Sequence, residues 1–526
     1  MRYDQRYPSI PHAVRSAAER FGDKSAIIDG DRQYSFVDLA DQMTEATRAA
    51  IALGVEKGDR VGLCAPNSAE WIVAALGILG AGGIIVPLNT RFKSGELSYI
   101  LRRSGAKALF ASSFLDNDYI AELQKADPDL PALLKTVSIL VPPGAANLSW
   151  QDFLDGGRAV SHAQAEESIN HLASDDISDV MFTSGTTGHP KGVMLTHGQS
   201  LRAYGWMAEE YTFVPSDSFL IIPPFFHCFG YKAGWLASLI HGVTVIPMRV
   251  FDAREALETI SRERVSILLG PPTIFSDLLN HPRRDEFDLS SLRVSMTGGT
   301  TIPESLVHAM KSRLSFDIVM SAYGLTEASA LVTTTRIGDS AETVAGTAGR
   351  PIPDVEVRIV DELGADVLPT QAGEVLVRGY TVTRGYWDDP EATAAAIDAK
   401  GWLHTGDIGR LDESGNLIIV DRKKEMYIVG GFNAYPAEIE KILLDFAPID
   451  QVAVIGVPDE RLGEVGCAFV VLGSDCRATE GEVIEWARGN MANFKVPRHV
   501  RFVERLPRNA SQKILKDELR AQISIR

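Results

Sequence analysis

The sequence has 526 residues, of which 45% are hydrophobic and 23% are charged. At roughly 100–200 residues per domain, this length predicts several compact units, and the composition excludes a chain that is disordered throughout. Lys and Arg number 52 against 69 Asp and Glu, and the resulting formal charge of −17 argues against unspecific binding of nucleic acid or anionic lipid.

Short β-branched segments alternate with helical periodicity through the first half of the chain. The pattern predicts strands at residues 26–28, 60–63, 84–86, 107–110, 243–246 and 265–269, and helices at 69–79 and 253–262. Such alternation indicates an α/β fold with mostly parallel sheets. Shorter alternating segments at 355–360 and 374–378 predict a β-rich subdomain.

The C-terminal part has a different pattern. A strand at 416–420 gives way to a cationic turn at 421–425, where we place the boundary between domains 1–423 and 424–526. Helices are predicted at 436–444 and 480–491, and strands at 451–455, 468–472 and 499–503. This second domain is therefore expected to be a small α+β unit.

No segment has the pattern of a membrane span or of a secretory signal. The longest apolar run, Ile72 to Leu88, is interrupted by Gly82 and Gly83, whereas a spanning helix needs about 20 apolar residues. The start of the chain lacks the apolar core of a signal peptide. The cysteines show no metal-binding or disulfide spacing, so we expect reduced thiols and a cytoplasmic protein. They are Cys64, Cys228, Cys467 and Cys476.

The densest chemical signal is the stretch MFTSGTTGHPKG at residues 181–192, which follows an apolar strand at 179–182. Its glycines let backbone N–H groups turn inward, while hydroxyls and Lys191 supply further donors, as an anion cradle requires. Pro190 stands where a Walker A loop needs glycine, which argues against a kinase or P-loop ATPase. The alternative is a flexible polar loop without a ligand.

The string from Thr183 to Gly192 resembles the signature of the adenylate-forming superfamily. This superfamily includes acyl-CoA synthetases, aryl-CoA ligases, firefly luciferase and peptide-synthetase adenylation domains. Further motifs follow in the family order, so the resemblance extends from about Ile27 to Leu515. It implies an N-terminal domain with two αβ sheets and a small β-barrel-like subdomain, and a small mobile α+β C-terminal domain. It also implies an AMP-forming acid–CoA ligase that uses ATP, Mg²⁺ and CoA.

The resemblance assigns nucleotide contacts to several separate segments. In the family, the tyrosine of SAYGLTE (321–327) stacks on adenine and the glutamate helps to hold Mg²⁺, here Glu327 with Thr183. TGG at 297–299 lies along adenine, and TGD at 405–407 contacts the ribose together with an arginine. The implied ATP-binding residues are Thr183, Ser184, Gly185, Thr186, Thr187, Gly188, Lys191, Gly299, Thr300, Ala322, Tyr323, Gly324, Thr326, Asp407, Arg422 and Lys513.

The last motif, PRNASQKIL at 507–515, resembles the family segment whose lysine bridges the acyl carboxylate and phosphate, here Lys513. The family usually has glycine before this lysine, and Gln512 adds strain of about 1 kcal/mol if φ must be positive. The resemblance places a domain hinge at Lys424. The implied catalytic residues are Lys513, Thr326, Glu327 and His227. The implied lining of the CoA tunnel is Gly430, Gly431 and Phe432.

The segment PPFFHCFGYKAG at 223–234 resembles the motif that borders the family's acyl pocket. Its phenylalanines favour an apolar acid, and it lacks the aspartate that binds the ammonium of an amino acid. The implied acyl-binding residues are Phe226, His227, Phe229, Tyr231 and Gly299. The sequence of this segment is most similar to that of the bacterial branch of the family that activates the C/D-ring propanoate left by steroid degradation. That acid is a methylated indanedione with a propanoate chain. Lys232 or Tyr231 is a candidate donor to a ring ketone.

Three other functions compete with this interpretation. They are a medium- or long-chain fatty-acid–CoA ligase, an acyl-AMP ligase for a carrier protein, and a catalytically silent homologue. The expected partners are a small carboxylic acid, ATP and CoA, with no nucleic acid; a homodimer is left open.

Overall fold

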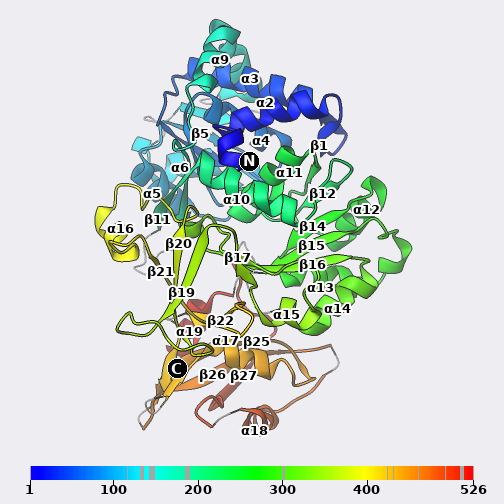
Figure 1. Cartoon of the computed structure of the whole chain (residues 1–526), viewed down its shortest axis with the longest axis vertical. Coiled ribbons are helices and arrows are strands. Elements are labelled where there is room, and N and C mark those ends of the chain that lie inside the picture. The colour runs from blue at the N-terminus through cyan, green and yellow to red at the C-terminus, as the bar shows by residue number, and fades with distance from the viewer. Residues whose placement is uncertain are drawn as a thin grey trace.

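The computed structural model describes residues 2–114, 117–130, 135–140, 148–183, 190–298, 302–422, 425–429, 432–459, 461–474, 476–491, 493–509 and 514–524. Figure 1 shows the N-terminal segments at the top, a small antiparallel sheet below them, and the C-terminal segments at the bottom. The fold is mixed α/β, as the sequence predicts.

The larger of two αβ sheets has nine strands. In spatial order they are β18 (Arg350–Pro351), β17 (Thr333–Thr334), β16 (Ile318–Tyr323), β15 (Val294–Gly298), β14 (Ile267–Gly270), β12 (Ser218–Ile221), β13 (Thr244–Pro247), β1 (Ser25–Asp29) and β2 (Arg32–Ser35). The central strands are parallel, and β2, β17 and β18 are antiparallel additions at the edges. The predicted strands at 26–28, 243–246 and 265–269 are confirmed.

The second sheet has seven strands. In spatial order they are β11 (Lys191–Thr196), β10 (Ile177–Thr183), β4 (Ile84–Pro87), β3 (Arg60–Cys64), β5 (Ala108–Ala111), β8 (Lys135–Ser138) and β9 (Leu148–Ser149). Only β11 runs antiparallel to its neighbour. The strands predicted at 60–63, 84–86 and 107–110 are confirmed. Two further short strands, β6 (Ser113–Phe114) and β7 (Asn117–Asp118), pair antiparallel with each other.

Helix α4 (Ala69–Gly80) contacts strands of both sheets and is buried at nearly every position. It forms where the apolar run begins, and the Ser68 hydroxyl accepts the Trp71 N–H at its first turn. Glycine is required where α4 meets α3 (Phe36–Leu53), because a Cβ at Gly77 would lie 2.5 Å from that of Ala46. None of the described helices is long and apolar enough to cross a membrane.

The other helices surround the sheets. They are α1 (Tyr3–Arg6), α2 (Ile10–Phe21), α5 (Ser94–Ser104), α6 (Tyr119–Ala126), α8 (Trp150–Gly156), α9 (His162–Asn170), α10 (His197–Glu210), a π-helix (Phe229–Leu236), α11 (Ala237–His241), α12 (Ala253–Glu263), α13 (Pro272–Asn280), α14 (Glu304–Arg313), α15 (Ala341–Gly346) and α16 (Pro390–Ala396). The predicted helix at 253–262 is confirmed as α12.

The β-rich subdomain is a four-stranded antiparallel sheet. Its strands are β19 (Val355–Val360), β20 (Gly373–Gly379), β21 (Leu403–Leu411) and β22 (Leu417–Arg422). In Figure 1 this sheet lies between the N-terminal and C-terminal segments. Strand β22 ends at Arg422, where the sequence predicts a change of domain.

The C-terminal segments form a separate α+β unit around one five-stranded sheet. The strands predicted at 451–455 and 468–472 are parts of a longer antiparallel pair, because the two strands continue to pair up to their turn. The elements are β23 (Tyr427–Val429), β24 (Phe432–Ala434), α17 (Pro436–Leu443), β25 (Ile449–Asp459), β26 (Gly463–Leu472), α18 (Glu480–Asn490), β27 (His499–Phe502) and α19 (Lys516–Ser524).

Candidate active site

Three predicted site segments meet where parallel strands end. Thr183 is the last residue of β10, Gly298 the last of β15 and Tyr323 the last of β16. Strands β15 and β16 are parallel neighbours, so their carboxyl ends lie at one edge of the nine-stranded sheet. In open α/β sheets this edge is the usual place for a ligand.

The two residues assigned to a metal, Thr183 and Glu327, are in direct contact. The Thr183 hydroxyl donates a hydrogen bond of 3.2 Å to Oε1 of Glu327. The backbone carbonyl of Glu327 accepts the N–H of Thr383 at 2.8 Å, which fixes the turn that carries the carboxylate. Residues from both large sheets therefore bring a hydroxyl and a carboxylate together at one point.

Tyr386 completes this contact and was not predicted from the sequence. Its hydroxyl donates to the same Oε1 of Glu327 at 3.1 Å. Burial and the neighbouring Glu327 carboxylate both raise the pKa of Tyr386, so its hydroxyl remains a neutral donor. The ammonium nitrogen of Lys191 lies 5.1 Å from the centre of the Tyr386 ring, within range of a cation–π contact.

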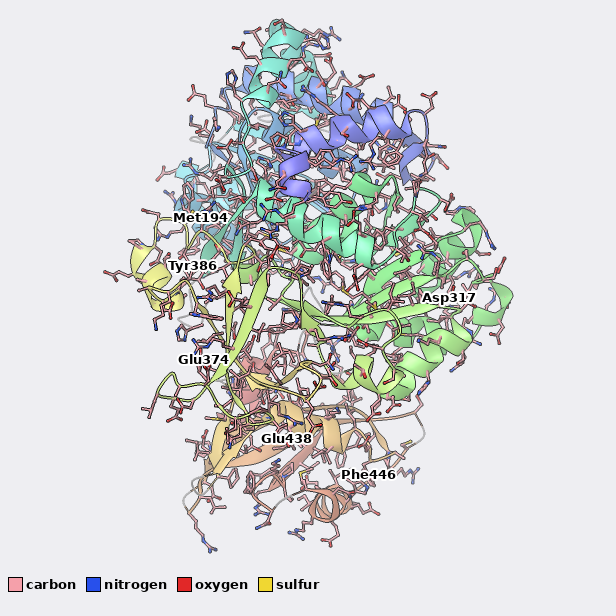
Figure 2. All side chains as sticks on the ribbon, in the orientation of Figure 1. Met194, Asp317, Glu374, Tyr386, Glu438 and Phe446 are labelled. Atoms are coloured by element: carbon pink, nitrogen blue, oxygen red, sulfur yellow. The ribbon has the colours of Figure 1, made fainter. Side chains whose placement is uncertain are left out.

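An open hollow of about 690 Å³ borders this cluster, lined among others by Met194, Arg384 and Tyr386. Met194 and Tyr386 lie on the same flank of the molecule, away from Asp317 (Figure 2). A smaller cavity of about 90 Å³ has Lys191 and Arg103 in its wall. Cationic side chains thus lie at the end of the predicted phosphate loop.

Tyr323 and Asp407, assigned to adenine and ribose, are also in contact. The Tyr323 hydroxyl donates to Oδ2 of Asp407 at 2.5 Å. Asp407 is buried on β21 and stands opposite Arg422 in the β21–β22 register. The predicted nucleotide residues of the nine-stranded and four-stranded sheets therefore converge.

The turn after β16 requires glycine at position 324. A Cβ on Gly324 would lie 2.2 Å from the carbonyl carbon of Ala330. Ser329 and Ala330 have φ values of 54° and 58°, so the chain reverses sharply and returns against Gly324. This reversal places Thr326 and Glu327 in a short 3₁₀ turn at the sheet edge.

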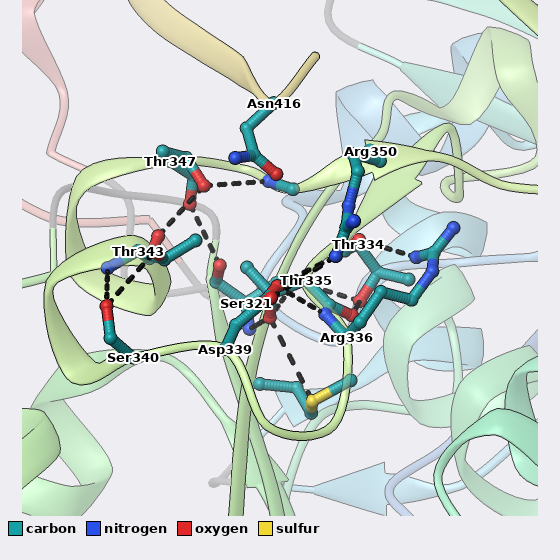
Figure 3. A network of polar contacts seen from close by, with 12 residues as sticks. Ser321, Thr334, Thr335, Arg336, Asp339, Ser340, Thr343, Thr347, Arg350 and Asn416 are labelled. Carbon is teal, nitrogen blue, oxygen red and sulfur yellow. Dashed lines mark hydrogen bonds and ion pairs between the residues drawn. The ribbon is translucent and has the colours of Figure 1, made fainter. Parts of the chain in front are cut away.

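A polar network holds the strand that leads into this turn (Figure 3). The backbone N–H of Ser321 donates to the Thr335 hydroxyl at 2.9 Å, and the Ser321 carbonyl accepts the Thr334 hydroxyl at 2.9 Å. The Ser321 hydroxyl donates to the carbonyl of Thr347 at 2.9 Å. Ala322 and Tyr323 follow directly, so their positions are tied to two other segments of the chain, at Thr334–Thr335 and at Thr347.

The predicted acyl segment divides into accessible and buried parts. Phe226, His227 and Phe229 are partly exposed, whereas Tyr231 is fully buried. The Tyr231 ring stacks on Trp235 with ring centres 4.8 Å apart. The first three residues therefore have access to a ligand, and Tyr231 belongs to the aromatic packing behind them.

A hydrogen bond to the ring of His227 determines which neutral tautomer this side chain adopts. Its Nδ1 accepts the N–H of Phe229 at 3.2 Å, and burial lowers the pKa of His227. A neutral imidazole that accepts at Nδ1 carries its proton on Nε2. His227 is therefore a neutral side chain with one N–H to donate.

Lys232 was a candidate donor to a ring ketone of the substrate, but in the structure it is paired with an acidic side chain. Its Nζ lies 3.0 Å from Oδ1 of Asp179, and both side chains are completely buried. The hydroxyl of Tyr231 has no hydrogen-bond partner among the residues described.

Many of the predicted residues lie outside the described residues. They are Ser184, Gly185, Thr186, Thr187, Gly188, Gly299, Thr300, Lys424, Gly430, Gly431, Gln512 and Lys513. Arg422 and Phe432 are placed by their backbone, on β22 and β24. Within the described part of the chain, no three His, Cys, Asp or Glu side chains form a metal-binding group.

Two sequence families match the chain. The family described as AMP-binding enzyme matches residues 14–387, and the AMP-binding enzyme C-terminal domain matches residues 438–513.

Individual relatives match over nearly the whole length. The protein named 3-[(3aS,4S,7aS)-7a-methyl-1,5-dioxo-octahydro-1H-inden-4-yl]propanoyl:CoA ligase from Mycobacterium tuberculosis is 49% identical over 513 residues, 97% of this chain and 98% of its own. The protein of the same name from Rhodococcus jostii is 47% identical over 524 residues, 98% of each chain. A solved structure of the anthranilate CoA ligase AuaEII in complex with anthranoyl-AMP has a TM-score of 0.88 at 28% identity, with 99% of this chain and 98% of that chain covered.

Proposed function

Since the chain belongs to the AMP-binding enzyme family and is an acid–CoA ligase of the AMP-forming type, we propose that its acid is a propanoate carried by a 7a-methyl-1,5-dioxo-octahydroindene ring system. The single observation that carries the proposal is the pair of bacterial relatives with this activity in their name, at 49% and 47% identity over nearly the full chain. The product is the corresponding propanoyl-CoA thioester.

The nucleotide is proposed to lie along the carboxyl edge of the nine-stranded sheet. Tyr323 supplies a flat ring there and Asp407 a buried carboxylate for the ribose hydroxyls. Their mutual hydrogen bond of 2.5 Å supports one shared site. Gly324 lets the chain turn closely enough for Thr326 to reach the α-phosphate.

Mg²⁺ is proposed to be held by Thr183 and Glu327 together with the nucleotide phosphates. The hydroxyl and carboxylate oxygens, 3.2 Å apart, are hard donors of the kind that Mg²⁺ prefers. Mg²⁺ sites of nucleotide-dependent enzymes often use only one or two protein groups, which fits the lack of a larger acidic cluster among the described side chains. Bound there, Mg²⁺ supplies positive charge against the phosphate oxygens.

Adenylation requires an acid carboxylate to attack the α-phosphate while pyrophosphate leaves. Three anionic groups must meet, so cations and backbone N–H groups lower the barrier most. Lys191 lies beside the proposed phosphate site, and the loop from Ser184 to Gly188 and Lys513 are proposed to contribute further donors. CoA thiolate then attacks the acyl carbon, the acyl–oxygen bond breaks, and AMP leaves.

The acid is proposed to enter along Phe226, His227 and Phe229. These side chains are apolar or neutral and partly exposed, as an apolar acid needs. Burial keeps His227 uncharged, so it separates the acyl group from the nucleotide without adding a charge. Gly299 completes the proposed acyl wall.

We further propose that the domains divide at residues 423 and 424, with Lys424 as the hinge. Support comes from the sheets, since β22 ends at Arg422 and the next sheet begins at Tyr427. Gly430, Gly431 and Phe432 are proposed to line the path of the pantetheine arm. A cytoplasmic location stays a proposal, supported by the four free cysteines.

In the test, the protein is incubated with ATP, Mg²⁺ and either the ring propanoate or a linear fatty acid. The acyl acceptor is either free CoA or an acyl-carrier protein, and both the AMP released and the mass of the product are measured. The proposal expects the ring propanoyl-CoA with free CoA as acceptor. Acyl transfer only to the carrier protein would contradict the CoA ligase assignment. AMP formed only from linear fatty acids would contradict the ring substrate, and no AMP from any acid would indicate a silent homologue.

A further inference from the structure

Lys232 and Asp179 form a buried ion pair that the reaction scheme does not use. Nζ of Lys232 lies 3.0 Å from Oδ1 of Asp179, and neither side chain is exposed to any extent. Lys232 is the only lysine in the described part of the chain that is completely buried. The other carboxylate oxygen of Asp179 accepts the Ser178 hydroxyl at 2.7 Å.

Such a pair is poor evidence for a gain in stability. Taking both charges out of water offsets most of their attraction, and apolar side chains of similar volume often serve equally well. In some proteins a buried pair instead fixes one arrangement of the elements that carry it.

The first element that this pair joins is strand β10, which contains Asp179. From Asp179 to Thr183 its pairing with β11 is regular, so Asp179, Met181 and Thr183 point to the same face of the strand. Each of these residues makes a contact from that face. Asp179 pairs with Lys232, the Met181 sulfur lies 3.1 Å from the Cys228 sulfur, and Thr183 donates to Glu327.

The second element is the π-helix Phe229–Leu236, which contains Lys232 and continues directly from the proposed acyl wall. π-helical turns are rare and are frequent at functional sites. This one begins in close contact with the chain before it, because a Cβ on Gly230 would lie 2.2 Å from the carbonyl oxygen of Pro223. The Tyr231 N–H also donates to the His227 carbonyl at 3.0 Å.

The contacts of Asp179, Met181 and Thr183 follow one another along one face of β10. Two of them reach the segment that holds His227 and Phe229, and the third reaches the carboxylate proposed to hold Mg²⁺. We infer that Asp179 and Lys232 are a positioning pair, which sets the acyl wall in register with the strand that begins the phosphate loop. This inference rests on the proposed function, since it takes Phe226–Phe229 as the wall of the acyl site.

The pair is tested by removing both charges at once, in Asp179→Asn/Lys232→Met. Removing one partner leaves a buried charge and threatens the fold, whereas Asn keeps an acceptor for Ser178. The matched control is Asp217→Asn/Arg293→Met. Arg293 and Asp217 contact each other at 2.6 Å just before β15 and β12, at the opposite end of the strands from the site.

The expected result is a fall of at least tenfold in kcat/KM for the acid in the Asp179/Lys232 double variant, with the Kd for ATP unchanged. The control pair should change kcat/KM less than twofold. Near-ultraviolet circular dichroism gives a readout that does not need activity, because Tyr231 stacks on Trp235 within the π-helix. Its signal should change in the first variant and not in the control.

An unchanged kcat/KM together with an unchanged near-ultraviolet spectrum would overturn the inference. If the double variant does not fold, Lys232→Arg keeps the charge with a larger head group, and the same fall in kcat/KM is expected. Failure of the proposed function has a different signature, since the wild-type protein then forms no thioester of the ring propanoate, either because it activates only linear fatty acids or because it releases no AMP from any acid. The spectroscopic comparison still decides whether the pair fixes the π-helix.

Discussion

Replacing Tyr386 by phenylalanine tests how the proposed Mg²⁺ site is held. Tyr386→Phe keeps the ring beneath Lys191 and removes only the hydroxyl that donates to Glu327 at 3.1 Å. A hydrogen bond to a charged group contributes about 1.5–3 kcal/mol. The Tyr386–Glu327 distance is long for an O–H···O bond, so we take about 1.5 kcal/mol, which corresponds to roughly tenfold in an equilibrium constant.

The expected result is a rise of about tenfold in the Mg²⁺ concentration needed for half-maximal AMP formation, because the Glu327 carboxylate is then held less firmly for the ion. The assay is AMP release at fixed ATP over a Mg²⁺ titration. Tyr7→Phe is the matched control, because its hydroxyl accepts from Arg20 among the N-terminal helices. The reasoning is refuted if Tyr386→Phe and Tyr7→Phe show the same Mg²⁺ dependence as the wild-type protein.

Three further predictions concern the fold around the site. Gly324→Ala should lower the free energy of unfolding by about 3 kcal/mol or more and abolish AMP formation, because its Cβ meets the Ala330 backbone; normal activity in a purified variant would contradict this. Ser68→Ala should cost about 1 kcal/mol in urea unfolding without changing KM, because the Trp71 N–H loses its acceptor; a changed KM would count against a purely structural cap. Burial lowers the pKa of His197 to about 3, so the unfolded chain binds a proton below about pH 6.5 that the folded protein does not. Stability should therefore fall as the pH drops from 6.5 towards 3, by about 2 kcal/mol at pH 5 from this group, and His197→Gln should show a shallower loss of stability with acid than the wild-type protein.

Much of the architecture was predictable because local patterns determine it. The buried helix α4, the strands β1, β3 and β4, and the α+β character of the C-terminal unit all follow from apolar periodicity and turn residues. The convergence of Thr183 and Glu327 was predictable only through the family motifs, since 144 residues separate them in the chain. No spacing rule brings two such distant positions together.

Tyr386 shows what the sequence alone leaves out. It lies in a loop that hydrogen bonds to both β11 and the Glu327 turn, and nothing in its local sequence identifies its partner. Lys232 shows the same difficulty for a buried charge. Its position in the acyl motif indicated a donor to substrate, whereas its partner is Asp179. The available signal was Asp179 itself, an acidic residue on the same strand face as Thr183.

The substrate proposal is tested most directly by competition between two acids. The wild-type protein is given ATP, Mg²⁺, a limiting amount of CoA, and equal concentrations of the dioxo-octahydroindenyl propanoate and octanoate. The ratio of the two thioesters, measured by mass spectrometry, equals the ratio of their kcat/KM values. We expect the ring propanoyl-CoA to exceed octanoyl-CoA by at least tenfold; an excess of octanoyl-CoA would contradict the assignment and favour a fatty-acid–CoA ligase.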